Sequence, residues 1–207
     1  QIKNLSGIES CINLTELYLF GNQLTDLIGL AGVNLPDLKT LNLDKNQITD
    51  LTGLAEANLP SLAVLNLYGN QSTDLSGLAG ANLPDLETLR LDQNQITDLT
   101  GLAEANLPSL AVLNLYGNQL TDLSGLAGIN LPDLKTLKLD QNQITDLTGL
   151  AEASLPSLRY AHLINNPLTK DILLTQIPPL DKKSIMVYAD YPEDWKTITS
   201  STESLIV

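Results

Sequence analysis

The sequence predicts an α/β solenoid, a right-handed superhelix with a parallel β-sheet on its concave face and short helical or 3₁₀ segments on its convex face. Two observations predict this fold. One phrase, L-x-x-L-x-L-x-x-N, recurs along the chain, and its closing asparagine returns every 24 residues without a slip. The apolar residues are mostly leucine, with a single Trp, Phe and Met, so the core repeats one side-chain shape. Such a period is typical of proteins whose units stack to form one continuous core. The closing asparagines are Asn22, Asn46, Asn70, Asn94, Asn118, Asn142 and Asn166.

Each phrase predicts one short parallel strand. Side chains alternate between the two faces of a strand, so Leu41 and Leu43 point into the core while Thr40, Asn42 and Asp44 point outward. The asparagine that follows turns the chain away from the sheet. Its amide can satisfy backbone groups of neighbouring turns that would otherwise be buried and unpaired, so we expect a structural asparagine ladder.

The segment after each asparagine predicts the convex side. Ile48, Leu51 and Leu54 enter the core at a spacing of three, and Pro60 ends the turn and leads to the next strand. Asp50 stands where its carboxylate can cap a short helical turn over residues 51–57. The six equivalent aspartates also suggest a calcium site, because calcium prefers clustered carboxylates. Each repeat lacks a second and third ligand, so we favour capping and predict no metal and no cofactor. The aspartates are Asp26, Asp50, Asp74, Asp98, Asp122 and Asp146.

A longer period of 48 residues lies on top of the 24-residue one. Residues 35–58 match 83–106 at all but three positions, and residues 59–82 match 107–130 at all but two. This identity indicates either recent tandem duplication or a human-made consensus. One core position departs from the pattern: Ser72 stands where Leu24 and Leu120 stand in sister repeats, which should cost about 2 to 4 kcal/mol.

The outward side chains of the strands are the candidate binding residues, because the core does not require them. Tyrosine and arginine are enriched at the energetic centres of protein interfaces. An alternative is that the tyrosines and valines only cover one another while the charges keep the face hydrated. The copies differ at outward positions 42, 90 and 138, which favours an interface. The candidate residues are Tyr18, Phe20, Asp44, Tyr68, Arg90, Asp92, Tyr116, Lys138, Asp140, Tyr160 and His162.

Charge and composition limit the class of partner. The net charge of -13 argues against nucleic acid and anionic membrane surfaces, since the long-range field repels both, and it favours a basic or neutral partner. No apolar run approaches the roughly 18 residues that span a bilayer, so we predict no membrane insertion. Cys11 is the sole cysteine, which forbids an intramolecular disulfide. The abrupt start within the repeat-like phrase from Leu5 to Ile8 suggests a fragment.

Catalytic patterns are absent from the sequence. There is no nucleophile elbow, phosphate loop or zinc-protease motif, and Cys11 and His162 lie 151 positions apart. We expect His162 to have a surface or cap role. The sequence therefore predicts a protein that is not an enzyme.

The recurring phrase N-Q-I-T-D-L-T-G-L resembles the bacterial, internalin-like class of leucine-rich repeats. The resemblance covers residues 5 to about 188, with 24 residues in place of the usual 22, and the first unit is closer to the shorter length. It implies a partial repeat over residues 1–13, a repeat array over 14–166, a cap over 167–190 and a polar tail over 191–207. In the cap, residues 170–176 are expected to be helical and residues 185–188 to form a final strand, with Trp195 packed on the cap.

The family resemblance implies protein binding and names no partner. We therefore expect a non-enzymatic protein–protein interaction module, monomeric, at the cell surface or outside the cell rather than in the cytoplasm. Two alternatives stay open. The chain is a structural or engineered scaffold without a natural ligand, or it is the repeat domain of a larger regulatory protein such as a multidomain GTPase.

Overall fold

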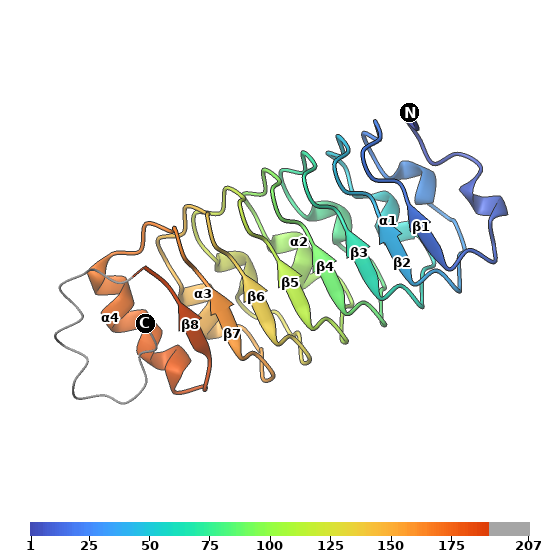
Figure 1. The fold of residues 1–207 in the computed structure, drawn as a ribbon. Helices are drawn as coiled ribbons and strands as arrows, with labels where there is room; N and C mark the ends of the chain where they lie inside the picture. Colours follow the sequence, from blue (N-terminus) through green and yellow to red (C-terminus); the bar gives the residue numbers. More distant parts are fainter. Residues whose placement is uncertain (191–207) are drawn as a thin grey trace.

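The computed structural model describes residues 1–190, which form eight parallel strands in one open sheet with the order β1 to β8 along the chain. Figure 1 shows an elongated array with the strands on one side and the short helical segments on the other. The predicted fold class is confirmed. The strands are β1 (Glu16–Tyr18), β2 (Thr40–Asn42), β3 (Val64–Asn66), β4 (Thr88–Arg90), β5 (Val112–Asn114), β6 (Thr136–Lys138), β7 (Tyr160–His162) and β8 (Met186–Tyr188).

The sheet register follows the sequence period from β1 to β7. Leu41 of β2 lies beside Leu65 of β3, and Asn66 lies beside Arg90 of β4, so partners are 24 residues apart. Only β8 departs, since Tyr160 pairs with Met186. Residues at equivalent repeat positions therefore form straight columns across the sheet.

The convex layer alternates between two kinds of turn. Repeats that read L-T-G-L-A-E form a short α-helix, whereas repeats that read G-L-A-G form a short 3₁₀ helix. In the latter, the glycine after the alanine, as at Gly80, has φ of 81°. A side chain rarely adopts this left-handed backbone, so glycine is required there and it ends the turn early. The segments are η1 (Ile8–Ser10), η2 (Ile28–Leu30), α1 (Gly53–Glu56), η3 (Ser76–Leu78), α2 (Thr100–Ala103), η4 (Ser124–Leu126) and α3 (Thr148–Glu152).

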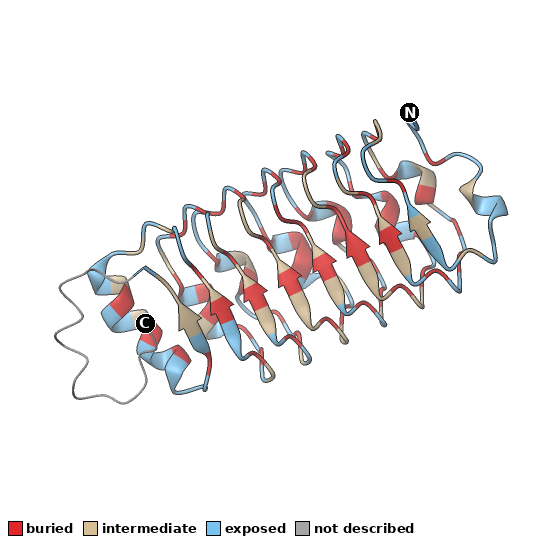
Figure 2. Cartoon of the chain, in the orientation of Figure 1, coloured by how far each residue is buried: buried red, intermediate tan, exposed pale blue. Residues whose placement is uncertain are grey.

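The core lies between the sheet and the convex turns, and Figure 2 shows buried residues running along its whole length. Leu41, Leu65, Leu89 and Leu113 at the strand centres have no exposed surface. Ser72 is also fully buried, and its hydroxyl donates to the carbonyl of Ile48 at 3.2 Å. The hydroxyl is thus satisfied, but it fills much less space than the leucines of the same column.

The asparagine ladder is present as predicted. The Asn46 amide nitrogen donates to the carbonyls of Leu19 at 2.9 Å and Leu43 at 3.0 Å, and its oxygen accepts the N–H of Leu24 at 3.1 Å. Asn46 is only 6% exposed. Each ladder asparagine thus satisfies buried backbone groups of two repeats, and the same set of bonds recurs at Asn70.

The convex aspartates accept hydrogen bonds at the start of each turn, as the capping interpretation predicts. Asp50 accepts the N–H of Thr52 at 2.8 Å, and Asp122 accepts the N–H of Ser124 at 2.9 Å. The N–H of Ser124 belongs to the first residue of η4, whereas that of Thr52 lies one residue before α1. At Asp98, the hydroxyl of Thr100 donates a second hydrogen bond to the carboxylate.

A column of close glycines, which the sequence analysis missed, sets the spacing of the convex turns. A methyl group added at Gly77 would lie 2.5 Å from the carbonyl carbon of Leu51, and one at Gly125 would lie 2.9 Å from that of Leu99. Gly53 and Gly101 approach the backbone of the preceding repeat in the same way. Only glycine allows the turns to stack at this distance.

The first residues occupy the convex position of a shorter repeat. The N–H of Gln23 donates to Ile2, as Gln47 donates to Leu24 one repeat later, and Leu5 packs against Gly29. The first unit is therefore two residues shorter than the others, in agreement with the expected length of about 22.

The last described residues form helix α4 (Lys170–Asp181) and strand β8. The helix is longer than the predicted 170–176, because it continues through Pro178 and Pro179. Two buried side chains, Ile177 and Leu180, hold this last turn against the core. The prolines themselves are exposed, so water can reach the carbonyl groups that their missing N–H groups leave unpaired. The predicted tail with Trp195 lies outside the described residues.

Candidate protein-binding face

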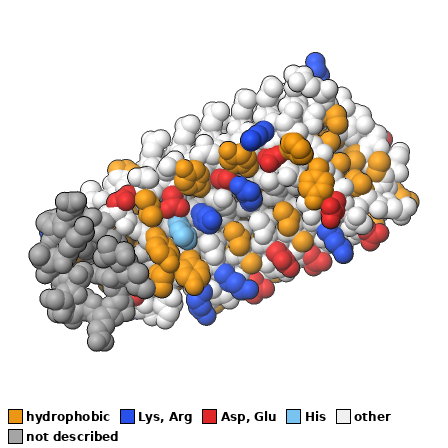
Figure 3. All heavy atoms as spheres, in the orientation of Figure 1, with side chains coloured by type: hydrophobic (Ala, Val, Ile, Leu, Met, Phe, Trp, Pro, Cys, Tyr) orange, Lys and Arg blue, Asp and Glu red, His pale blue; other side chains and the backbone are white. Residues whose placement is uncertain are grey.

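The concave face consists of the outward side chains of the eight strands, in three columns. The column after the strands alternates aromatic and acidic residues: Phe20, Asp44, Tyr68, Asp92, Tyr116 and Asp140. Figure 3 shows hydrophobic and acidic side chains alternating along this side of the molecule. Backbone hydrogen bonds join adjacent repeats at this column. The N–H of Gly21 donates to the carbonyl of Asp44, and the N–H of Lys45 donates to the carbonyl of Tyr68. The register thus brings together the predicted residues of each column.

The N-terminal end of the concave face is the most open. Tyr18 is 54% exposed and Phe20 is 62% exposed. The Tyr18 hydroxyl donates to Glu16 at 3.0 Å, and this hydrogen bond, together with the charge of Glu16, raises the pKa of Tyr18. Two large aromatic side chains therefore face solvent beside a carboxylate.

An ion pair occupies the centre of the face. Arg90 donates to both carboxylate oxygens of Asp92, at 3.2 and 2.9 Å, while Asp92 is almost fully buried. The guanidinium also lies over the Tyr68 ring, 5.6 Å from its centroid, and the Lys45 ammonium lies 5.9 Å from the same centroid. The hydrogen bond to Asp92 raises the pKa of Arg90 against the effect of its own burial. Arg90 is thus held by one carboxylate and one ring.

Asp44 lacks such a partner. Its Oδ1 is buried and accepts no hydrogen bond, and its Oδ2 receives only a long contact of 3.5 Å from the Asn66 amide. At the other end of the column, Asp140 accepts the N–H of Ile164 at 2.9 Å. The three equivalent aspartates therefore differ in their partners although their repeats are nearly identical.

The C-terminal end of the face is an aromatic cluster. The His162 ring stacks on Tyr188 with centroids 4.6 Å apart, and Tyr160 lies 6.5 Å from the same tyrosine. Burial lowers the pKa of His162, although Asp140 acts in the opposite direction. Tyr188 was not among the predicted face residues. The prediction assigned β8 to the cap, and the 26-residue offset of β8 hides its alignment with the columns.

The remaining candidates, Tyr116 and Lys138, are half-buried on the same face. Within residues 1–190 no arginine or lysine lies over the Tyr116 ring as Arg90 lies over Tyr68. The face offers aromatic area, charges of both signs and one unpartnered carboxylate oxygen. These are groups that bind another surface by contact and pairing.

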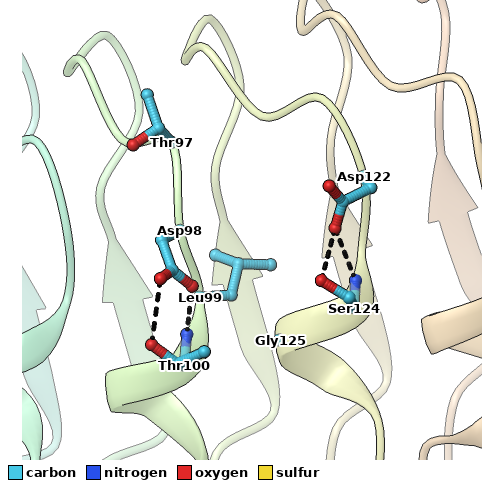
Figure 4. A pocket seen from close by; sticks show the side chains of 7 residues that line it. All are labelled: Thr97, Asp98, Leu99, Thr100, Asp122, Ser124 and Gly125. Atoms are coloured by element: carbon cyan, nitrogen blue, oxygen red, sulfur yellow. Dashed lines mark hydrogen bonds between the residues drawn. The ribbon is translucent and has the colours of Figure 1, made fainter.

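A polar hollow of about 270 Å³ lies on the convex side. Figure 4 shows that its carboxylates point to their own turns, Asp98 toward Thr100 and Asp122 toward Ser124. These bonds use the oxygens that a ligand would need. No group of three potential metal ligands occurs within residues 1–190. None of the helices in this range is long and apolar enough to cross a bilayer.

Family comparisons agree with the repeat pattern. A family model described as leucine rich repeat matches residues 36–96, 84–144 and 108–168. A second, described as leucine rich repeats in two copies, matches residues 12–56. The curated proteins include no match to the chain.

Solved structures show the same likeness. Internalin C2 of Listeria monocytogenes is 36% identical, with a TM-score of 0.72 over 91% of this chain and 76% of that one. A leucine-rich repeat protein of Leptospira interrogans is 28% identical, with a TM-score of 0.59 over 89% of this chain and 50% of that one. A chain of the Drosophila Toll–Spätzle complex is 20% identical, with a TM-score of 0.63, and shares only the fold. The present chain covers 32% of its length.

Proposed function

Because the chain belongs to the leucine-rich repeat family, in its bacterial internalin-like class, we propose that it is a non-enzymatic module that binds a protein partner through its concave face. Leucine-rich repeats generally mediate protein–protein interaction. The observation that carries the proposal is the exposure of Tyr18 and Phe20 at the N-terminal end of a face whose centre holds the ion pair of Arg90 and Asp92. Aromatic side chains with arginine are the groups that contribute most at protein interfaces.

The chemistry of the face supports a neutral or basic partner rather than nucleic acid. The net charge of -13 repels a phosphate backbone, and the exposed aromatics alternate with carboxylates. We further propose that the module acts as a monomer and works at the cell surface or outside the cell. Its likeness to internalin C2 supports that location.

A capture experiment tests the proposal. The wild-type chain is immobilised and exposed to labelled cell-surface proteins, beside a variant carrying Tyr68→Ala, Tyr116→Ala and Arg90→Ala. The control carries Glu56→Ala, Glu104→Ala and Glu152→Ala, which change exposed residues of the convex turns. We expect the first variant to lose a protein that the wild type and the control both capture.

The near identity of the repeats supports a second candidate, a structural scaffold without a ligand. It predicts identical capture by all three proteins, and this result would overturn the binding proposal.

A further inference from the structure

Asp44 is the one described side chain with a buried oxygen or nitrogen that has no hydrogen-bond partner: its Oδ1. A buried acceptor without a donor is costly, and native structures leave few of them. The single contact of the other oxygen, 3.5 Å from Asn66, is too long to compensate the charge. Within residues 1–190 the only ion pair between side chains is Arg90 with Asp92. Asp44 is therefore a carboxylate that no cation of the described residues contacts directly, although its charge acts on Arg90 at longer range.

The second 48-residue copy shows what direct contact with a cation looks like. There the guanidinium of Arg90 sits on the carboxylate of Asp92 and over the ring of Tyr68, the aromatic residue one repeat before it. In the first copy, Asp44 corresponds to Asp92, and Phe20 corresponds to Tyr68. Position 42, which corresponds to Arg90, holds asparagine. Two of the three parts are present and the guanidinium is not.

Access from solvent is open on the Phe20 side. Phe20 is 62% exposed, whereas Tyr68 is half-buried and already has Lys45 and Arg90 over its ring. The rest of the Asp44 side chain is partly exposed, and rotation of its carboxyl group exchanges the two oxygens. A planar guanidinium can accept both contacts at once, because it stacks on a ring and donates two parallel hydrogen bonds to a carboxylate.

We propose that Asp44 and Phe20 form the seat of an arginine side chain supplied by the protein partner. This assignment deepens the proposed function and rests on it. The partner's guanidinium lies over the Phe20 ring and donates to the Asp44 carboxylate, as Arg90 does on Tyr68 and Asp92. The strong negative charge of the chain attracts such a basic segment. The partner thus completes in the first copy the arrangement that the second copy completes by itself.

The test uses N-acetyl-arginine amide as the probe and the full chain labelled for NMR. N-acetyl-citrulline amide, which has nearly the same shape without the charge, is the matched probe. We expect the arginine probe to shift the backbone amide signals of Gly21 and Asp44 in a saturable way, and the citrulline probe to leave them in place. Asp44→Asn should weaken this binding by about tenfold, the effect of losing one charge-assisted contact.

Two further variants make the assignment specific. Asn42→Arg supplies the cation from within the chain and should abolish the shifts at Gly21 and Asp44. Asp140→Asn removes a carboxylate from the same column, where the N–H of Ile164 already occupies it, and should leave the binding unchanged. Circular dichroism checks that every variant is folded.

Equal binding of the arginine probe by the wild type, Asp44→Asn and Asn42→Arg would overturn the arginine seat. So would shifts spread evenly over all the aspartates of the column. Neither result bears on the capture experiment with the Tyr68, Tyr116 and Arg90 variant, so the two proposals can fail separately.

Discussion

Asp44 and Asp92 stand at the same position of two 48-residue copies, yet one carboxylate has an unpartnered oxygen and the other is held by two hydrogen bonds. The two copies differ at three positions in their first halves and two in their second halves. One of these, Asn42 against Arg90, accounts for the difference. The comparison teaches that shared core residues fix the backbone of both copies, while single outward substitutions set the chemistry of each section of the concave face.

The shared backbone predicts equal and large effects at the close glycines. Gly53→Ala and Gly101→Ala each push a methyl group into the backbone of the preceding repeat, and each should cost about 3 kcal/mol of unfolding free energy. Urea denaturation measures the cost. Glu104→Ala, at an exposed nearby position, should change stability little, and a tolerated alanine at either glycine would show that the turns do not need this approach.

Loss of a ladder asparagine should cost the same stability in both copies and less at the N-terminal end of the ladder. Asn46→Ala and Asn94→Ala each leave one buried N–H without a partner and leave two carbonyls with one asparagine donor instead of two, so we expect a loss of about 2 kcal/mol. Asn22 is half-buried and bonds the shorter first unit, so Asn22→Ala should cost less. Thermal unfolding of the three variants compares them, and an equal loss at Asn22 would contradict a role that depends on burial.

The one leucine position where the copies differ should be improvable. Ser72→Leu restores the residue that Leu120 provides in the second copy, and it should stabilise the fold by about 1 to 2 kcal/mol through added apolar burial. The carbonyl of Ile48 keeps a donor, since it also accepts the N–H of Gln71 at 3.0 Å. The shift of the urea midpoint measures the gain. A loss of stability would mean that the core of the first copy is packed tightly around the serine and has no room for a leucine.

The smallest expected effect is on the stability of the fold at acid pH. Hydrogen bonds from Ser76 and Ser124 lower the pKa of Asp74 and Asp122, which are equivalent in the two copies. A lowered folded-state pKa means that each carboxylate stabilises the fold above the usual carboxyl pKa near 4, and that this contribution is lost as the pH falls through the folded-state value. Asp74→Asn and Asp122→Asn should flatten the acid limb of stability against pH equally, by on the order of a few tenths of a kcal/mol since both groups are exposed. Unequal slopes would show that the convex sides of the two copies differ.

The sequence was sufficient for three of the features that repeat. The strand leucines, the asparagine ladder and the turn aspartates each meet a need that recurs from unit to unit, so six or seven copies report the same requirement. The glycine column was missed because its reason is a distance between repeats, which no single phrase contains. The extension of α4 through Pro178 depends on tertiary contacts of Ile177 and Leu180.

The concave face shows where sequence reasoning stops. The sequence identified Asp44, Arg90 and Asp92 as outward residues. It could not tell with which of the two carboxylates the Arg90 guanidinium pairs. That choice depends on a side-chain rotamer within one repeat. Tyr188 entered the face through a strand whose offset differs from the period.

Binding through the concave face is tested most directly by the dissociation constant of a captured partner. The measurement compares the wild type with the Tyr68, Tyr116 and Arg90 alanine variant and with the convex Glu56, Glu104 and Glu152 alanine variant. We predict that the concave variant binds at least about a hundredfold more weakly, as expected when interface centres are removed, and that the convex variant binds as the wild type does. Equal constants for the wild type and the concave variant, or a loss confined to the convex variant, would contradict it.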